Sequence, residues 1–178
     1  MASHAGFVLY RRGLGLRGTL KTSEMSLTPS DTDFMAEALA EAELAAGLDE
    51  VPVGCVIVDA GGKVIGRGHN RTRTDKSPLA HAEMIAIQAA CEQAGYERLN
   101  GCTCFVTLEP CFMCAGALAH ARIERVVFAL RDPKFGGCVS LGEVLSDPRL
   151  NHRARLTEGP LDEACRELLV GFFRNRRK

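Results

Sequence analysis

The stretch CTCFVTLEPCFMCAGALA, residues 102–119, joins two periodic patterns at one proline. β-Branched and aromatic residues are frequent in Cys102–Leu108, which predicts a buried strand. Pro110 suits the first turn of a helix, and the apolar residues behind it extend that helix to Ala119. A strand that leads directly into a helix is the repeating unit of an α/β sheet.

The same alternation continues on both sides of this stretch. Glycine turns, capping residues and helical spacing divide the remaining chain into elements. We expect helices over residues 28–47, 81–95 and 161–176, a hairpin of strands 53–58 and 63–68, a fourth strand at 125–130 and a weaker one near 153–156. Strands alternating with helices imply a sheet covered on both faces.

The chain has 178 residues, which suits one domain with a sizeable core. We assign residues 28–178 to that domain and predict a disordered leader over residues 1–27. The leader is basic, with no acidic residue up to Lys21, so an organellar transit peptide is one alternative. An upstream start codon, with Met25 as the true start, is another.

Composition excludes some classes of function. The formal net charge is zero, so any surface that attracts nucleic acid must be local. No apolar run is long enough to span a membrane. Eight cysteines in a sequence of cytoplasmic type predict free thiols and a metal site more than a disulfide framework.

Two short motifs carry the chemistry: His81-Ala82-Glu83 and Pro110-Cys111-Phe112-Met113-Cys114. A catalytic zinc site takes three protein ligands and leaves the fourth position to water. His81, Cys111 and Cys114 supply three such ligands, and Glu83 is left free to carry protons. This combination is the known signature of zinc nucleobase deaminases, in which the glutamate acts first as a base and then as an acid.

Each motif alone has a simpler interpretation. A single His-x-Glu usually caps a helix, and a single Cys-x-x-Cys can be a redox pair or half of a structural zinc site. Their joint occurrence favours the hydrolytic centre. The two cysteines are three residues apart at a predicted helix start, where backbone amides favour thiolates. We place five other cysteines in the core or sheet: Cys55, Cys91, Cys102, Cys104 and Cys165.

From about Phe34 to Arg177 the chain closely resembles the bacterial tRNA-specific adenosine deaminases, within the cytidine-deaminase-like superfamily. The resemblance lies in blocks such as Glu50–Gly54, Gly68–Arg71, Thr107–Ala117 and Leu150–Arg153, besides the zinc motif. It implies a three-layer α/β/α fold around a five-stranded mixed sheet. It further implies a homodimer with one zinc ion per subunit, which converts the wobble adenosine of a tRNA anticodon, in an arginine tRNA, to inosine.

Carried over by position, the resemblance assigns roles to individual residues. His81, Cys111 and Cys114 match the zinc ligands and Glu83 the proton shuttle. Asn70 matches the residue that hydrogen-bonds the target base, Val53 an apolar pocket residue and Asp132 a substrate-facing loop aspartate.

Local positive charge agrees with an RNA substrate. Arg71, Arg73 and Lys76 precede the zinc histidine, and the chain ends in Phe172-Phe173-Arg174-Asn175-Arg176-Arg177-Lys178. From this segment we select Phe173, Arg174 and Arg176 as RNA contacts. The simpler interpretation is a packed and solvated helix end.

Two other classes of function stay open at this point. One is a zinc deaminase of a free base or nucleotide, of the guanine or cytidine type. The other is a non-catalytic RNA-binding subunit with a deaminase-like fold, although such a subunit should lack the proton shuttle and Glu83 is present.

Overall fold

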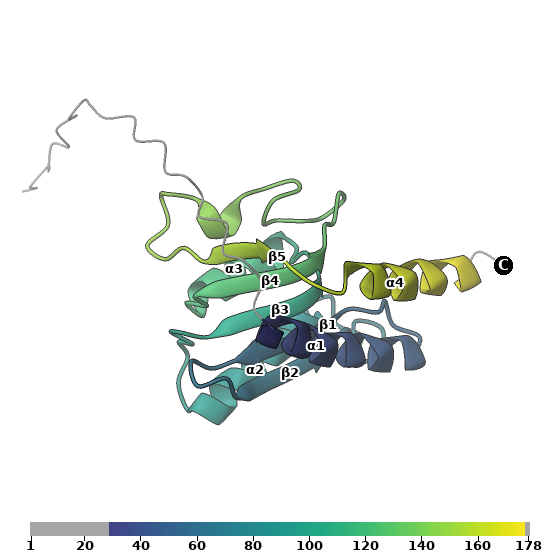
Figure 1. Cartoon of the computed structure of the whole chain (residues 1–178), viewed down its shortest axis with the longest axis horizontal. Coiled ribbons are helices and arrows are strands. Elements are labelled where there is room, and N and C mark those ends of the chain that lie inside the picture. Colours follow the sequence, from purple (N-terminus) through teal and green to yellow (C-terminus); the bar gives the residue numbers. More distant parts are fainter. Residues whose placement is uncertain (1–28, 177–178) are drawn as a thin grey trace, which may run out of the picture.

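A five-stranded sheet in the order β2-β1-β3-β4-β5 runs through the centre of the computed structural model, which describes residues 29–176 (Figure 1). β1 pairs antiparallel with β2 and β3, whereas β3, β4 and β5 are parallel, so the sheet is mixed as expected. The strands are β1 (Gly54–Val58), β2 (Val64–His69), β3 (Thr103–Leu108), β4 (Arg125–Leu130) and β5 (Arg155–Glu158). The helices are α1 (Pro29–Gly47), α2 (Ala82–Ala94), α3 (Phe112–His120) and α4 (Asp162–Arg176), with a short 3₁₀ turn, η1, at Val144–Ser146.

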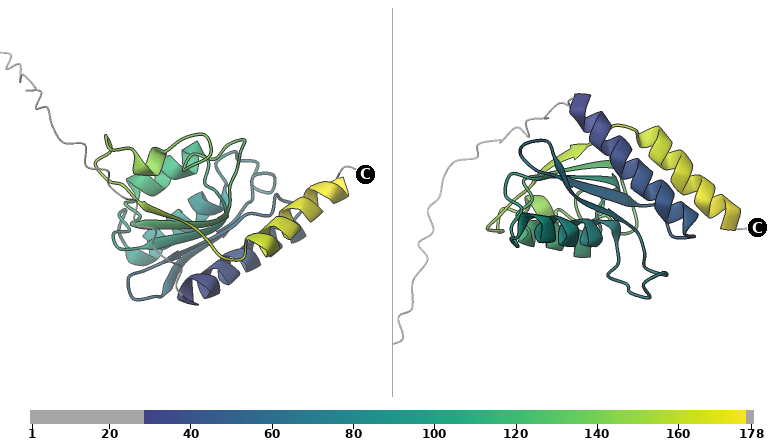
Figure 2. Two further views of the ribbon diagram at one scale, coloured as in Figure 1. Left: turned by 45° about the horizontal axis from the view of Figure 1, so that its top comes forward. Right: turned by 90° about the horizontal axis from the view of Figure 1, so that it is seen from below.

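Helices cover both faces of this sheet. α2 and α3 pack on one face, and α1 and α4 lie alongside each other on the other (Figure 2). Successive residues of the central strands serve the two cores in turn. In β1, Cys55 and Ile57 belong to the core under α2 and α3, whereas Val56 and Val58 belong to the core under α1. Burial on both faces explains why these strands are continuous apolar runs.

Gly68 brings α2 onto the end of β2. A Cβ atom at Gly68 would lie 2.3 Å from the carbonyl oxygen of Ala82, so only glycine allows this approach. The first turn of α2 therefore rests against the strand end that leads into Asn70. The close packing sets the residues after β2 beside those that open α2.

The predicted elements are confirmed, with shifts at their ends. β5 begins at Arg155, because the N–H of Ala154 donates to the carbonyl of Leu145 at 3.0 Å and pairing along β4 starts only afterwards. α3 begins at Phe112 and not at Pro110. The predicted leader and the basic residues Arg177 and Lys178 lie outside the described residues. Within residues 29–176, no helix is long and apolar enough to cross a membrane.

Candidate active site

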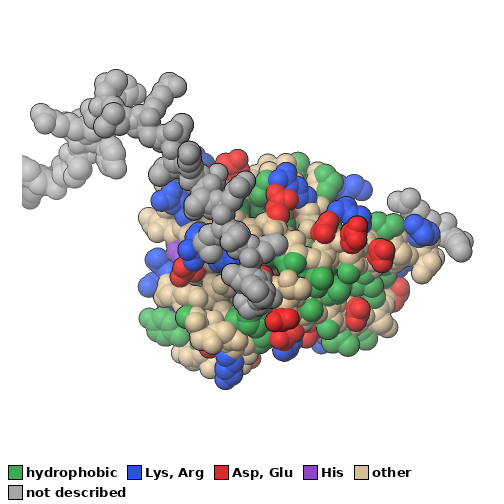
Figure 3. Space-filling view, in the orientation of Figure 1, with side chains coloured by type: hydrophobic (Ala, Val, Ile, Leu, Met, Phe, Trp, Pro, Cys, Tyr) green, Lys and Arg blue, Asp and Glu red, His purple; other side chains and the backbone are tan. Residues whose placement is uncertain are grey.

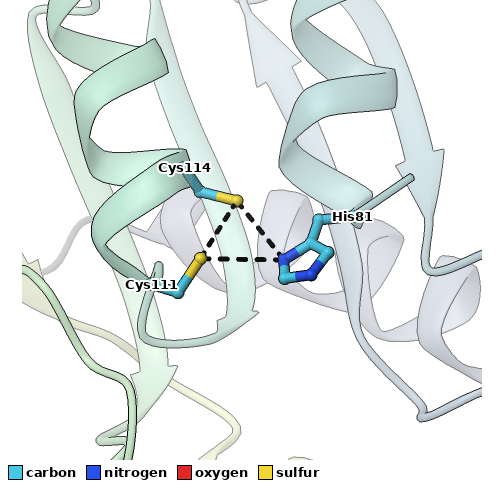
Figure 4. A group of neighbouring side chains, drawn as sticks. All are labelled: His81, Cys111 and Cys114. Carbon is cyan, nitrogen blue, oxygen red and sulfur yellow. Dashed lines mark hydrogen bonds between the residues drawn. The ribbon is translucent and has the colours of Figure 1, made fainter. Parts of the chain in front are cut away.

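His81 and Cys111 occupy equivalent positions, each as the residue that immediately precedes a helix. Both have extended backbone angles, with φ −77° and ψ 154° at His81 and φ −68° and ψ 172° at Cys111. Neither side chain caps its helix, so both are free to bind a ligand. Cys114, the third residue of α3, completes the group (Figure 4). Two helix starts thus converge beyond the carboxyl ends of β3 and β4.

The three ligand atoms are already at metal-binding spacing. Nδ1 of His81 lies 3.7 Å from the sulfur of Cys111 and 3.5 Å from that of Cys114, and the two sulfurs are 3.6 Å apart (Figure 4). In a tetrahedral site, Zn–S bonds of about 2.3 Å and a Zn–N bond of about 2.0 Å place the sulfurs about 3.8 Å apart and the nitrogen about 3.5 Å from each. The donor set therefore fits zinc. Within the described residues it is the only such group of His, Cys, Asp and Glu.

The structure corrects one detail of the sequence prediction. The helix predicted to begin at Pro110 contains only one of the two cysteines, because α3 begins at Phe112 and Cys111 lies before it. They meet because a side chain just before a helix folds back over the third helical residue, as it does in a capping box.

The two thiols have different surroundings, which shift their pKa values in opposite directions. Hydrogen bonding from Cys114, despite partial burial, and the contact with His81 lower the pKa of Cys111 to about 4. The same contact and burial raise the pKa of Cys114 far above its usual value. A divalent cation removes this asymmetry, because metal ligation deprotonates both thiols.

Glu83 is the second residue of α2 and is only 4% exposed. Its carboxyl group is close enough to the Cys114 thiol for each group to influence the pKa of the other. Burial raises the pKa of Glu83 above its usual value. A buried carboxyl beside the three ligands, and not among them, has the placement of a proton carrier.

Asn70 and Val53 lie together at the edge of this site. The backbone N–H of Asn70 donates to the carbonyl of Val53 at 3.0 Å, Asn70 is buried, and Val53 packs partly against the core below α2. Asp132 has a different surrounding. Its Oδ1 accepts hydrogen bonds from the backbone N–H groups of Lys134 at 2.9 Å and Phe135 at 3.3 Å, so this carboxylate stabilises its own turn.

The predicted RNA contacts at the end of the chain lie on α4, across the sheet from α3. Phe173 and Arg174 are exposed, and Phe173 meets Phe172 edge to face at 5.4 Å. Arg176 already has partners, since its Nε donates to Asp49 Oδ1 at 3.1 Å and its guanidinium stacks over Phe172. Figure 3 shows acidic and hydrophobic side chains intermixed over the face of α1 and α4. This face as a whole is not a basic surface.

The basic loop before His81 is also partly neutralised. Arg71 donates to Asp75, with the shortest contact at 2.8 Å, and Arg73 donates to Asp49 Oδ2 at 2.6 Å. These ion pairs are largely exposed to solvent, so their energies are small. Breaking either ion pair therefore costs little free energy.

Two buried glutamates were given no role by the sequence analysis. Glu109 precedes Pro110 and accepts backbone N–H groups from Asp132 at 3.0 Å, Cys138 at 3.1 Å and Val139 at 2.7 Å. It fixes the loop that follows β4 against the start of α3. The sequence already indicates such a role, because a carboxylate that directly follows a buried strand needs hydrogen-bond partners.

Glu50 is the second of these residues and is fully buried. It accepts hydrogen bonds from the loop that connects Asn70 with His81. The sequence also indicates the burial of Glu50, because this residue directly precedes the apolar residues that lead into β1.

The fold and this site together define a zinc-dependent deaminase. The family model for the cytidine and deoxycytidylate deaminase zinc-binding region matches residues 28–130. A tRNA-specific adenosine deaminase of Bacillus subtilis is 46% identical over 148 residues, which is 83% of this chain and 91% of that protein. The chain belongs to the family of tRNA-specific adenosine deaminases.

Solved structures agree with this assignment. One from a study of A-to-I editing by tRNA:A34 deaminases at the wobble position is 44% identical, with a TM-score of 0.74 over 78% of this chain and 99% of that one. A guanine deaminase from Nitrosomonas europaea has a TM-score of 0.70 over 94% of this chain and 98% of that one. At 21% identity, this second likeness shows the fold alone.

Proposed function

We propose that the protein hydrolyses adenosine to inosine at the wobble position of a tRNA anticodon, with an arginine tRNA as its substrate. The observation that carries the reaction is the convergence of His81, Cys111 and Cys114 beside the buried carboxyl of Glu83. Support for the RNA comes from the 46% identical relative and the 44% identical structure, both of which bear the name of tRNA deaminases. The arginine tRNA is what the family resemblance implies.

His81, Cys111 and Cys114 hold the metal in this proposal, one ion per chain. Zinc bound there supplies a water that is acidic near neutral pH, the nucleophile that hydrolysis needs. Glu83 takes one proton from the attacking water and delivers it to a ring nitrogen of adenine. It then takes the proton of the new hydroxyl group at C6 and delivers it to the amino group, so that the C6=O bond forms as the C6–N bond breaks and ammonia leaves. Its burial keeps bulk water from competing for that proton.

The base must leave its stack to reach this site. An anticodon loop is largely single-stranded, so the cost of extruding one base is reduced. Asn70 then provides polar recognition and Val53 an apolar wall. Arg71 and Arg73 flank this position and bind the loop phosphates after releasing their carboxylates, while Phe173, Arg174 and Arg176 extend the contact along α4. Asp132 contacts RNA only if its turn reopens.

A homodimer in the cytoplasm completes the proposal. Four apolar side chains next to the metal ligands are 36% to 67% exposed: Phe112, Phe135, Val139 and Leu141. The ring of Phe112 packs on Gly142, which keeps this surface continuous. A second copy would bury it. Sedimentation should therefore give a dimer for the wild type and a monomer for Leu141→Glu, and a wild-type monomer would contradict the dimer.

The test of the reaction is direct. Purified protein is incubated with a synthetic anticodon stem-loop and inosine is located by sequencing, with free guanine and cytidine as parallel substrates for ammonia release. We expect inosine at the wobble position only. Ammonia from guanine or cytidine without inosine would favour the free-base enzyme, and tight RNA binding without either product would favour the non-catalytic subunit.

A further inference from the structure

Glu50 holds the loop between Asn70 and His81 through an unusual concentration of hydrogen bonds. Its side chain is fully buried, and its hydrogen-bond partners within the described residues are Asn70 and members of that loop. Oε1 accepts the backbone N–H groups of Arg73 at 2.9 Å and Thr74 at 2.6 Å, and the Thr74 hydroxyl at 2.9 Å. Oε2 accepts the Thr72 hydroxyl and Asn70 Nδ2, each at 3.4 Å.

The contact with Glu50 decides which way the side-chain amide of Asn70 points. An ionised carboxylate can only accept hydrogen bonds, so Asn70 must turn its NH₂ group toward Glu50. Burial alone would raise the pKa of Glu50, but the hydrogen bonds from Thr74, Arg73 and Thr72 outweigh it and lower this pKa, so the group is ionised at neutral pH.

The oxygen of the same amide is left for a ligand. Within residues 29–176, Oδ1 of Asn70 has no hydrogen-bond partner, and it is not among the side-chain atoms sealed from solvent. An asparagine amide reads adenine by accepting from the exocyclic amine while it donates to a neighbouring ring nitrogen. Such recognition requires a fixed orientation of the amide. A flipped amide would direct its NH₂ group at the exocyclic amine of the base, and both groups are hydrogen-bond donors.

We infer that Glu50 is a positioning residue that sets the hydrogen-bond polarity of Asn70 and thereby the recognition of an amine-bearing base. The inference rests on the proposed function for its substrate and deepens it. Glu50 itself touches no reacting atom. It acts through Asn70, and through the loop whose far end is His81.

Glu50→Gln separates the two tasks of this carboxylate. The glutamine oxygen can still accept the hydrogen bonds of Arg73 and Thr74, so the loop stays anchored. The glutamine amide then faces Asn70 Nδ2, donor against donor, and the Asn70 amide must turn over or move away. The variant therefore changes polarity while it preserves size.

The kinetic test is a double-mutant cycle of Glu50→Gln and Asn70→Ala on single-turnover deamination of the anticodon stem-loop. We expect Glu50→Gln to lower kcat/KM by about tenfold to a hundredfold, with zinc content unchanged. In the Asn70→Ala background the same change should have little further effect, because its target is gone. Losses that multiply would overturn the inference.

A second measurement does not depend on the substrate. In ¹⁵N-labelled protein, the side-chain NH₂ signal of Asn70 should shift and exchange faster with water in Glu50→Gln, while the backbone amides of Arg73 and Thr74 stay protected. An unchanged Asn70 signal would overturn the inference even if the wild type makes no inosine. Failure of the wild type to make inosine, by contrast, would overturn the proposed function alone.

Asp31→Asn is the matched control, since it also neutralises a buried carboxylate. Asp31 pairs with Arg125 at 2.8 and 3.0 Å, where α1 meets β4, away from the loop. Measured at a temperature where both variants are folded, Asp31→Asn should leave the Asn70 signal and kcat/KM unchanged. An equal change in both variants would mean that Glu50→Gln acts through general destabilisation.

Discussion

The backbone N–H of Arg71 donates to the carbonyl oxygen of Ala80 at 2.9 Å. This bond closes the neck of a ten-residue loop, because the two residues are its first and last members. Asn70 lies directly before the neck and His81 directly after it. A residue proposed to read the base and a residue proposed to bind the metal are thus held together by one backbone contact.

Removing the carboxyl of Glu83 should abolish turnover and spare the metal. We expect Glu83→Ala to lower kcat by at least about a hundredfold, the usual contribution of a positioned acid–base group. Zinc content should remain at one ion per chain by elemental analysis. Glu92→Ala removes an exposed carboxylate from the same helix and should retain activity. Full activity of Glu83→Ala would exclude the proton shuttle.

Removing one thiol should release the metal. Cys111→Ala leaves two protein ligands, so both zinc and activity should be lost. The fold should persist, because Cys111 lies outside both hydrophobic cores. Circular dichroism checks the fold, and Cys91→Ala, at the far end of α2, should keep its zinc. Stoichiometric zinc in Cys111→Ala would contradict ligation.

The stability of the protein should depend on pH through Glu50. Its pKa is lower in the folded state than its usual value of 4.5, so folding is favoured when the group is ionised. This stabilisation is complete above the usual pKa and disappears as the pH falls through the folded value. The charged residues around Glu50 are Arg71, Arg73 and Asp49. The guanidinium groups of Arg176 and Arg73 lower the pKa of Asp49.

Urea unfolding of wild type and Glu50→Gln at several pH values measures this contribution. The difference in free energy of unfolding should be largest at neutral pH and should shrink in acid. A difference that stays constant with pH would show that folding does not lower the pKa of Glu50.

Shortening the chain at its end should weaken RNA binding and flatten its dependence on salt. Deleting residues 174–178 removes four basic residues. Each lost phosphate contact lowers the slope of log affinity against log salt by about 0.7 for single-stranded RNA. Arg155→Ala is the control, because this arginine lies at the opposite end of the sheet and pairs with Glu124. Equal slopes for truncated and full-length protein would exclude an RNA contact there.

Much of this molecule follows from local patterns. The fourth strand lies at Arg125–Leu130 as predicted, because an apolar run of that length bounded by charged residues suits a buried parallel strand. The edge strand β5 lies two residues later than predicted, since Ala154 donates its N–H to Leu145 and not to β4, which the local sequence pattern does not show. The ion pair of Arg176 could not be predicted from local patterns either, because its partner Asp49 is 127 residues away.

The motif of His81, Glu83, Cys111 and Cys114 was determined by the sequence alone, because metal chemistry depends on residue type and on spacing near a helix start. Tertiary structure decided the rest. It set the ligand atoms 3.5 to 3.7 Å apart and brought Glu50 within hydrogen-bonding distance of Asn70. Glu50 and Asn70 are 20 residues apart, and only the packing of β1 against β2 closes that distance.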